Sequence, residues 1–175
     1  MQNEDFLLET EKMQHETPSL AYSFIIKEKN RLDKEKLKKL HLPSSPLIAQ
    51  LREGKTIEIN GKKIDGKKLI YKEEGKKITF IMDTMKNTNC EKIAKDSDLL
   101  VCESTYSKEE EQLAKEHFHL TSVQAAEIAK RAKCKSLILT HLSQKYEHNH
   151  KLLLQEAKKI FKNTTIAEDF FSLEI

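Results

Sequence analysis

The pattern of apolar and polar positions along the chain predicts strands and helices in alternation. Short apolar runs predict strands at 6–8, 20–26, 77–84, 98–105 and 136–140, with two more near Thr165 and Phe170. Apolar residues at helical spacing predict helices at 32–42, 89–97, 107–118, 121–132 and 150–161. Thr121, followed by Gln124, forms the capping box that begins one of these helices. This alternation predicts an α/β layered fold.

One segment, from Lys27 to about Lys77, differs from the rest of the chain. "PSSP" at 43–46 ends a short helix there, and hairpin-type turns follow at Asn60-Gly61 and Asp65-Gly66. The segment holds 16 Lys or Arg against 8 Asp or Glu, whereas the whole chain has a net charge of +3. Such a surplus suits contact with nucleic acid, but a solvated lysine-rich surface gives the same count. Charge alone favours the solvated surface.

Composition limits the class of protein further. Charged residues make up 34% of the chain, and no apolar run approaches the roughly 20 residues that a membrane helix needs. The acidic start, "MQNEDFLLET", lacks the order of a signal peptide. The three cysteines are widely spaced without a C-x-x-C motif, which favours reduced thiols over disulfides. We therefore expect a cytoplasmic protein that does not contact a membrane.

Side chains that can bind a metal or transfer a proton lie at the ends of three predicted strands. These are Asp83, Glu103 and His141, and His119 stands at the start of a helix. Each alone is readily explained as a cap or a locally hydrogen-bonded residue. Together, at the carboxyl ends of strands, they predict a site. Carboxylate and imidazole suit a metal-dependent hydrolase, and a histidine oriented by a glutamate suits proton transfer instead. The chain has no P-loop, G-x-G-x-x-G or G-x-S-x-G motif.

Five segments in order resemble the motifs of ribonuclease Z, the metallo-β-lactamase-fold endonuclease that trims the 3′ ends of tRNA precursors. They are "HETPSLAY", "IMDT", "CEST", "HLTSVQAAEIAKRA" and "LILTHLSQKY". Asp83 and His119 lie 36 positions apart, and His119 and His141 lie 22 apart, as expected for that family. The resemblance implies an α/β fold that forms the C-terminal part of a metallo-β-lactamase αββα sandwich, covering 1–26 and 77–175. It also implies an inserted basic tRNA-binding arm at 27–76, which reverses the preference for a merely solvated surface.

The resemblance also implies roles for single residues. His15, Asp83 and His141 match metal ligands, with Asp83 bridging two zinc ions. Glu103 and His119 match the pair that assists proton transfer at the scissile phosphate.

Further residues match the substrate side of the family's site, namely Thr121, Ser143, Lys145 and Tyr146. Lys145 stands where an arginine is expected, and Met82 replaces a glycine before Asp83. Lysine keeps the charge but loses the bidentate fork of arginine. Ser45-Pro46 replaces the arm's usual Gly-Pro. His148 and His150 are expected on the surface at a helix start. The family is typically a homodimer whose arm serves the partner's site.

One departure limits these expectations. The family's H-x-H-x-D-H motif is absent, and His15 already lies close to the start of the chain. With only three of the family's ligands, the chain is expected to bind metal weakly and to have little nuclease activity by itself. A partner or missing N-terminal half would complete the site, as in a split gene, a frameshift or an incomplete gene model. The alternatives are a tRNA-binding module that does not cleave, and a related hydrolase with another substrate.

Overall fold

We describe the fold from a computed structural model, which describes residues 3, 5–42 and 46–175. The chain divides into two compact units. The body unit comprises 1–26 and 76–175, and the arm unit comprises 27–75. Among the helices of the described residues, none is long and apolar enough to cross a membrane.

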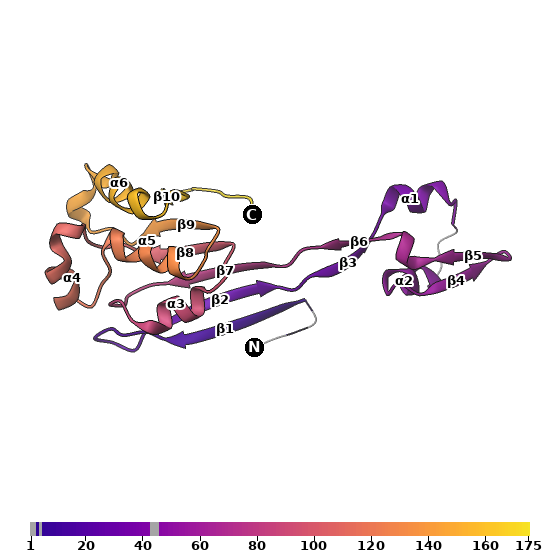
Figure 1. The fold of residues 1–175 in the computed structure, drawn as a ribbon, viewed down its shortest axis with the longest axis horizontal. Coiled ribbons are helices and arrows are strands. Elements are labelled where there is room, and N and C mark those ends of the chain that lie inside the picture. Colours follow the sequence, from indigo (N-terminus) through magenta and orange to yellow (C-terminus); the bar gives the residue numbers. More distant parts are fainter. Residues whose placement is uncertain (1–2, 4, 43–45) are drawn as a thin grey trace. The chain divides into compact units, whose positions relative to one another are not determined.

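A six-stranded sheet forms the centre of the body unit (Figure 1). The first two strands pair antiparallel with each other, and the second pairs antiparallel with the third; the remaining pairs are parallel. In spatial order the strands are β1 (Phe6–Lys12), β2 (Leu20–Ile26), β7 (Lys76–Ile81), β8 (Leu99–Glu103), β9 (Ser136–Thr140) and β10 (Thr164–Ile166). The parallel strands bring their carboxyl ends to one edge of the sheet.

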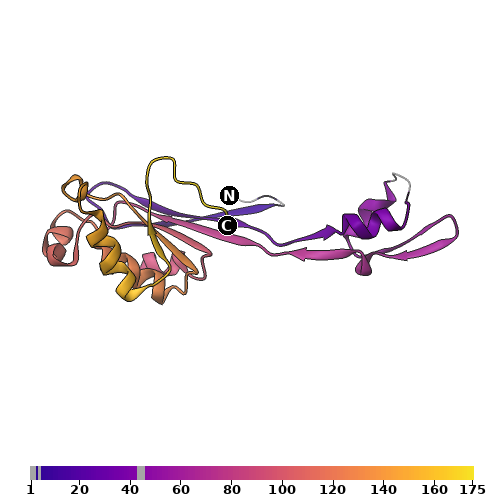
Figure 2. The ribbon, with the colours of Figure 1, turned by 90° about the horizontal axis from the view of Figure 1, so that it is seen from above.

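Helices cover one face of this sheet (Figure 2). They are α3 (Thr88–Ala94), α5 (Ser122–Arg131) and α6 (His150–Ile160), while α4 (Glu111–Glu116) follows a short 3-10 turn, η2 (Lys108–Glu110). Leu100, Leu137 and Leu139 of the sheet and Ile128 of α5 are fully or almost fully buried in the core between the layers. Each such side chain contributes about 1.5 to 3 kcal/mol by leaving water. The capping box of Thr121 and Gln124 is present, as predicted.

The opposite face of the sheet is covered only in part. Leu20, Tyr22 and Phe80 remain 45%, 41% and 41% exposed, and Tyr22 pairs with Phe80 across β2 and β7. Residues of the C-terminal segment, among them Leu173 and Ile175, line a pocket together with residues of β8 and β9 such as Leu99 and Ile138. Large apolar side chains at this level of exposure, gathered on one sheet face, are typical of an interaction surface.

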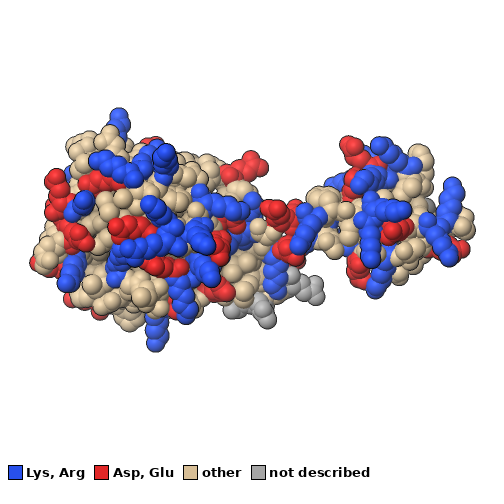
Figure 3. Space-filling view, in the orientation of Figure 1, with Lys and Arg blue, Asp and Glu red and all other residues tan. Residues whose placement is uncertain are grey.

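The arm unit has a small core of its own, formed by Leu51, Ile57 and Leu69. Its elements are β3 (Lys29–Leu32), α1 (Lys34–Lys39), α2 (Leu47–Arg52), β4 (Thr56–Ile59), β5 (Lys62–Asp65), η1 (Gly66–Lys68) and β6 (Ile70–Glu73). β3 pairs with β6, and β4 pairs with β5. Lys and Arg side chains project from much of its surface (Figure 3).

Several expectations from the pattern need correction. Asn60-Gly61 does make the β4–β5 turn, with φ of 52° and 74°, as predicted. Asp65-Gly66 does not make a hairpin, because the Asp65 side chain caps the 3-10 turn η1 instead. No strand forms near Phe170, which lies in a turn with φ of 65°. The strands β3 and β6 and the helix α2 were not predicted. Of "PSSP", 43–45 lie outside the described residues, as does Ser45 of the expected Gly-Pro position.

Candidate metal and proton-transfer site

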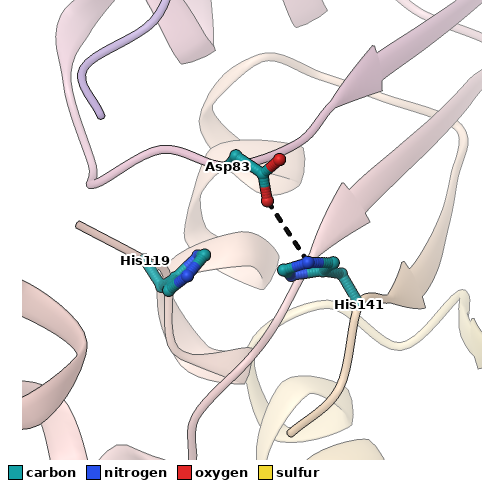
Figure 4. Close-up of side chains that lie close together, drawn as sticks. All are labelled: Asp83, His119 and His141. Atoms are coloured by element: carbon teal, nitrogen blue, oxygen red, sulfur yellow. Dashed lines mark ion pairs between the residues drawn. The ribbon is translucent and has the colours of Figure 1, made fainter. Parts of the chain in front are cut away.

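The candidate site lies at the carboxyl edge of the parallel strands (Figure 4). Asp83 follows β7, Glu103 is the last residue of β8, and His141 follows β9. His119 comes from the loop between α4 and α5. Because parallel strands end at a common edge, these side chains converge although they are far apart in the sequence.

Three of these side chains can reach a common ion. Asp83, His119 and His141 each offer a ligand atom, and the three atoms lie within 4.8 Å of one another. His141 Nε2 is 3.2 Å from Asp83 Oδ1, and the ring centroids of His119 and His141 are 5.3 Å apart. Ligands at about 2.0 to 2.2 Å from one ion stand roughly 3.4 Å apart in a tetrahedron, so the first distance fits a shared metal. The side chains of Asp83 and His141 are 47% and 46% exposed, which leaves this position open to solvent.

The backbone is constrained at the same place. Asp83 and His141 have φ of 46° and 53°, and Phe118, which precedes His119, has φ of 58°. Left-handed backbone at residues other than glycine costs about 1 to 3 kcal/mol each and is concentrated at functional sites. Met82 is not among the described residues with positive φ, so glycine is not required before Asp83.

Glu103 connects several residues of the site through hydrogen bonds to its carboxylate. Its carboxylate is fully buried. One oxygen accepts a hydrogen bond from the Thr84 N–H, and the other accepts from the Thr105 hydroxyl at 2.8 Å and the Leu120 N–H at 3.1 Å. That second oxygen is also 3.0 Å from His119 Nδ1. Hydrogen bonds on both oxygens replace the water that this charge loses on burial.

Glu103 also changes the acidity of His119. The hydrogen bond from the imidazole to Glu103 raises the pKa of His119, partial burial opposes this, and the charges of Glu103 and Asp83 add to the rise. A raised pKa keeps more of this imidazole protonated near neutral pH. Since Nδ1 is engaged by Glu103, only Nε2 is left to face a substrate or an ion. This arrangement suits a proton donor.

His15 lies next to this group but outside the cluster of three. Its ring centroid is 5.4 Å from that of His119 and 6.3 Å from that of Phe118. Its Nδ1 is 3.2 Å from the Thr17 hydroxyl and accepts a hydrogen bond from the Thr17 N–H. The structure therefore brings His15 to the edge of the site without placing its ring within reach of the same ion position.

Two of the four expected substrate residues have hydroxyl groups that are already engaged. Thr121 is buried and accepts a hydrogen bond from Gln124 N–H at the start of α5. Tyr146 is buried, and its hydroxyl accepts from Ser107 N–H and donates to Glu110. Both hydroxyls are therefore taken up by contacts within the protein.

The other two lie closer to solvent. Lys145 pairs with Glu110, and its ammonium lies 4.8 Å from the centre of the Tyr106 ring. Ser143 begins the short turn η3 (Gln144–Tyr146), and its N–H donates to Thr105 O at 3.1 Å. His148 is exposed, and His150 is the first residue of α6.

Two residues of the site were missed in the sequence, Thr105 and Tyr106. They lie two and three residues after Glu103 in "CESTY", so their closeness to the site could have been inferred. Their partners, His141 and His117, lie in other loops, and only the fold reveals those contacts.

Comparisons with known proteins identify relatives of the whole chain, although no family model matches it. It is 37% identical over 180 residues to the ribonuclease Z of Pediococcus pentosaceus, a match that covers 99% of this chain and 58% of that protein. The chain thus spans little more than half the length of this relative.

Solved structures show the same fold. The metallo-β-lactamase fold protein YhfI from Bacillus subtilis has a TM-score of 0.64 and 19% identity, covering 99% of this chain and 52% of that one. Human tRNase Z, short form, has a TM-score of 0.56 and 23% identity, covering 100% of this chain and 46% of that one. The expected fold class is confirmed, and the chain belongs, over its whole length, to the ribonuclease Z family.

Proposed function

We propose that this chain supplies the C-terminal part of a ribonuclease Z, which removes the 3′ trailer from tRNA precursors with metal-activated water. The observation that carries the proposal is the convergence of Asp83, His119 and His141 beside the buried Glu103. The names of its relatives, ribonuclease Z and tRNase Z, point to cleavage of tRNA, and the resemblance of the motifs points to removal of the 3′ trailer.

Asp83 and His141 would hold the metal, with zinc as the expected ion, and His15 lies next to His119. A bound metal supplies a nucleophilic hydroxide and stabilises charge on phosphate oxygens. The chain's own residues do the rest. Glu103 orients His119 and favours its protonated form, and His119 gives its proton to the leaving oxygen.

The uncovered sheet face supports the need for an N-terminal half. Leu20, Tyr22 and Phe80 form a half-exposed apolar row on the side of the sheet without helices. The relatives are longer by an amount that could supply a second layer. We propose that a polypeptide carrying H-x-H-x-D-H covers this face and adds the missing ligands, and that the assembled enzyme pairs with a second copy.

The arm unit is proposed to hold tRNA by its phosphates. Within 27–75 basic residues outnumber acidic ones by 14 to 8. Each neutralised phosphate releases counterions, which makes such binding depend steeply on salt. The three described cysteines are free and buried, which fits a reducing, cytoplasmic location.

A complementation experiment tests the proposal. The 175-residue chain, incubated with precursor tRNA and Zn²⁺ or Mn²⁺, should cleave poorly. Addition of the N-terminal half of the Pediococcus enzyme should restore cleavage at the 3′ end, and His119→Asn should abolish it again. Robust cleavage by the chain alone would refute the need for a second half.

A non-cleaving tRNA-binding module is the alternative function. Both functions need the arm to bind tRNA, and cleavage in the complemented mixture distinguishes them. Replacing 27–75 by a short Gly-Asn turn should weaken precursor tRNA binding and flatten its salt dependence. The matched control changes lysines on α6 and just after it, Lys158, Lys159 and Lys162, to Gln. Tight binding by the wild-type chain without cleavage in any complemented mixture would favour the binding module.

A further inference from the structure

Thr105 connects two parts of the site that the proposed mechanism treats separately. Its hydroxyl oxygen lies 2.8 Å from Glu103 Oε2 and 3.1 Å from His141 Nδ1. The same Glu103 oxygen is 3.0 Å from His119 Nδ1. One carboxylate oxygen therefore touches the proton-donor histidine directly and the ligand histidine through one hydroxyl.

The Thr105 side chain is held firmly in this position. The residue is only 7% exposed, and a β-branched side chain has few rotamers available. Its neighbours are fixed as well, because Ser104 N–H donates to Thr140 O at 2.9 Å and Ser143 N–H donates to Thr105 O at 3.1 Å. These bonds tie the end of β8 to the loop after β9.

The Thr105 hydroxyl has a single hydrogen to give. The candidate acceptors are Glu103 Oε2 at 2.8 Å, the His141 carbonyl at 3.0 Å and His141 Nδ1 at 3.1 Å. A buried carboxylate is the strongest acceptor of the three, and it also makes the shortest contact. With that hydrogen on Glu103, the hydroxyl oxygen presents a lone pair to His141, which favours the ring proton on Nδ1.

We propose that Thr105 is a positioning residue that fixes the Nδ1–H form of His141 and thereby frees Nε2 to bind a metal. His141 Nε2 is the nitrogen that faces Asp83, at 3.2 Å. Histidine ligands in metal sites generally donate their other N–H to a fixed acceptor, which sets the tautomer and orients the ring. Here the acceptor is a hydroxyl that is itself oriented by Glu103.

The first experiment does not depend on the proposed function. In metal-free protein, Asp83 could draw the ring proton to Nε2, so the comparison is made in an Asp83→Ala background. Imidazole ¹⁵N–¹H spectra at about pH 9 report which nitrogen of His141 is protonated, and His141→Asn assigns its signals. We expect Nδ1–H with Thr105 present and Nε2–H after Thr105→Val. Thr105→Ser, which keeps the hydroxyl, should retain Nδ1–H.

Thr165→Val serves as the matched control, because it makes the same change at an exposed position of β10. It should leave the His141 tautomer unchanged. Nε2–H in the Asp83→Ala chain itself, or the same tautomer with and without the Thr105 hydroxyl, would overturn the assignment.

The consequence for metal binding rests on the proposed function and has its own readout. Calorimetric titration with Zn²⁺ should show roughly 10- to 100-fold weaker binding for Thr105→Val, as found when partners of ligand histidines are removed. Thr105→Ser and Thr165→Val should stay close to the wild type. If the wild type binds no zinc while the tautomer shifts as described, the metal site fails and the role of Thr105 stands. Equal zinc affinity for Thr105→Val and wild type would refute its role in binding.

Discussion

Replacing Glu103 with Gln tests how strongly the buried carboxylate holds the site together. Glutamine has nearly the same volume, so the change removes an acceptor without opening a cavity. Its single oxygen retains most bonds in the place of Oε2, where it can still face Thr105, His119 and Leu120 N–H. Its NH₂ group then takes the place of Oε1 and faces Thr84 N–H. Two buried donors, the NH₂ group and Thr84 N–H, are then left facing each other without an acceptor.

The cost follows from these two donors. A buried donor without an acceptor costs about 1 to 3 kcal/mol, which puts the loss of unfolding free energy at about 2 to 6 kcal/mol. The hydrogen bonds that remain are weaker because they are made to a neutral amide oxygen. This loss is offset because the variant no longer buries the charge of the Glu103 carboxylate. With a urea dependence of about 2 kcal/mol/M, the midpoint should fall by roughly 1 to 3 M.

The assay is urea unfolding of the 175-residue chain at pH 7, followed by far-ultraviolet circular dichroism. Glu127→Gln is the control, because Glu127 pairs with Lys86 through side chains that are 33% and 28% exposed. A pair this open to solvent should contribute no more than about 1 kcal/mol. If Glu103→Gln lowers stability no more than Glu127→Gln does, the carboxylate does not organise the site.

Three further substitutions test single features. Thr121→Ala should lower the unfolding free energy by about 0.5 to 2 kcal/mol through loss of the cap, and an unchanged urea midpoint would contradict this. Tyr146→Phe leaves Ser107 N–H without its acceptor and should cost about 1 to 3 kcal/mol by the same assay; a neutral result would show that the hydroxyl is dispensable. Burial opposes ionisation of Asp98, but hydrogen bonds from Lys135 and a backbone N–H outweigh it and lower its pKa below 3.8. The contribution of Asp98 to the unfolding free energy is therefore complete above about pH 4 and is lost as pH falls through the folded-state pKa. Asp98→Asn should therefore lose less unfolding free energy on acidification than the wild type. Equal losses of unfolding free energy in both proteins below pH 4 would refute this.

Local patterns in the sequence were enough to find the elements of the body unit. The run "LAYSFII" predicts a strand at 20–26, and β2 has those bounds. Thr121 and Gln124 specify a helix start through side-chain contacts three residues apart. Such patterns depend only on residues within one turn or one strand, so they can be recognised without knowledge of the fold.

Features that depend on distant partners were not predictable in this way. "KNRL" and "IYKE" lack alternation and become β3 and β6 only by pairing with each other. Left-handed backbone is more common at Asp and His than at most residues, but no local pattern in the sequence marks Asp83 and His141 for it. Thr105 looks like any strand-end threonine until the loop after β9 is placed against it.

The position of the arm unit in the chain has a consequence for folding. The chain leaves the sheet after Ile26 and returns at Lys76, and these two residues are partners across β2 and β7. The closure entropy of the long excursion exceeds that of a four-residue turn by only about 2 kcal/mol. The arm can therefore open and close as its own cooperative unit, and its amide hydrogens should exchange independently of those in the central ladder.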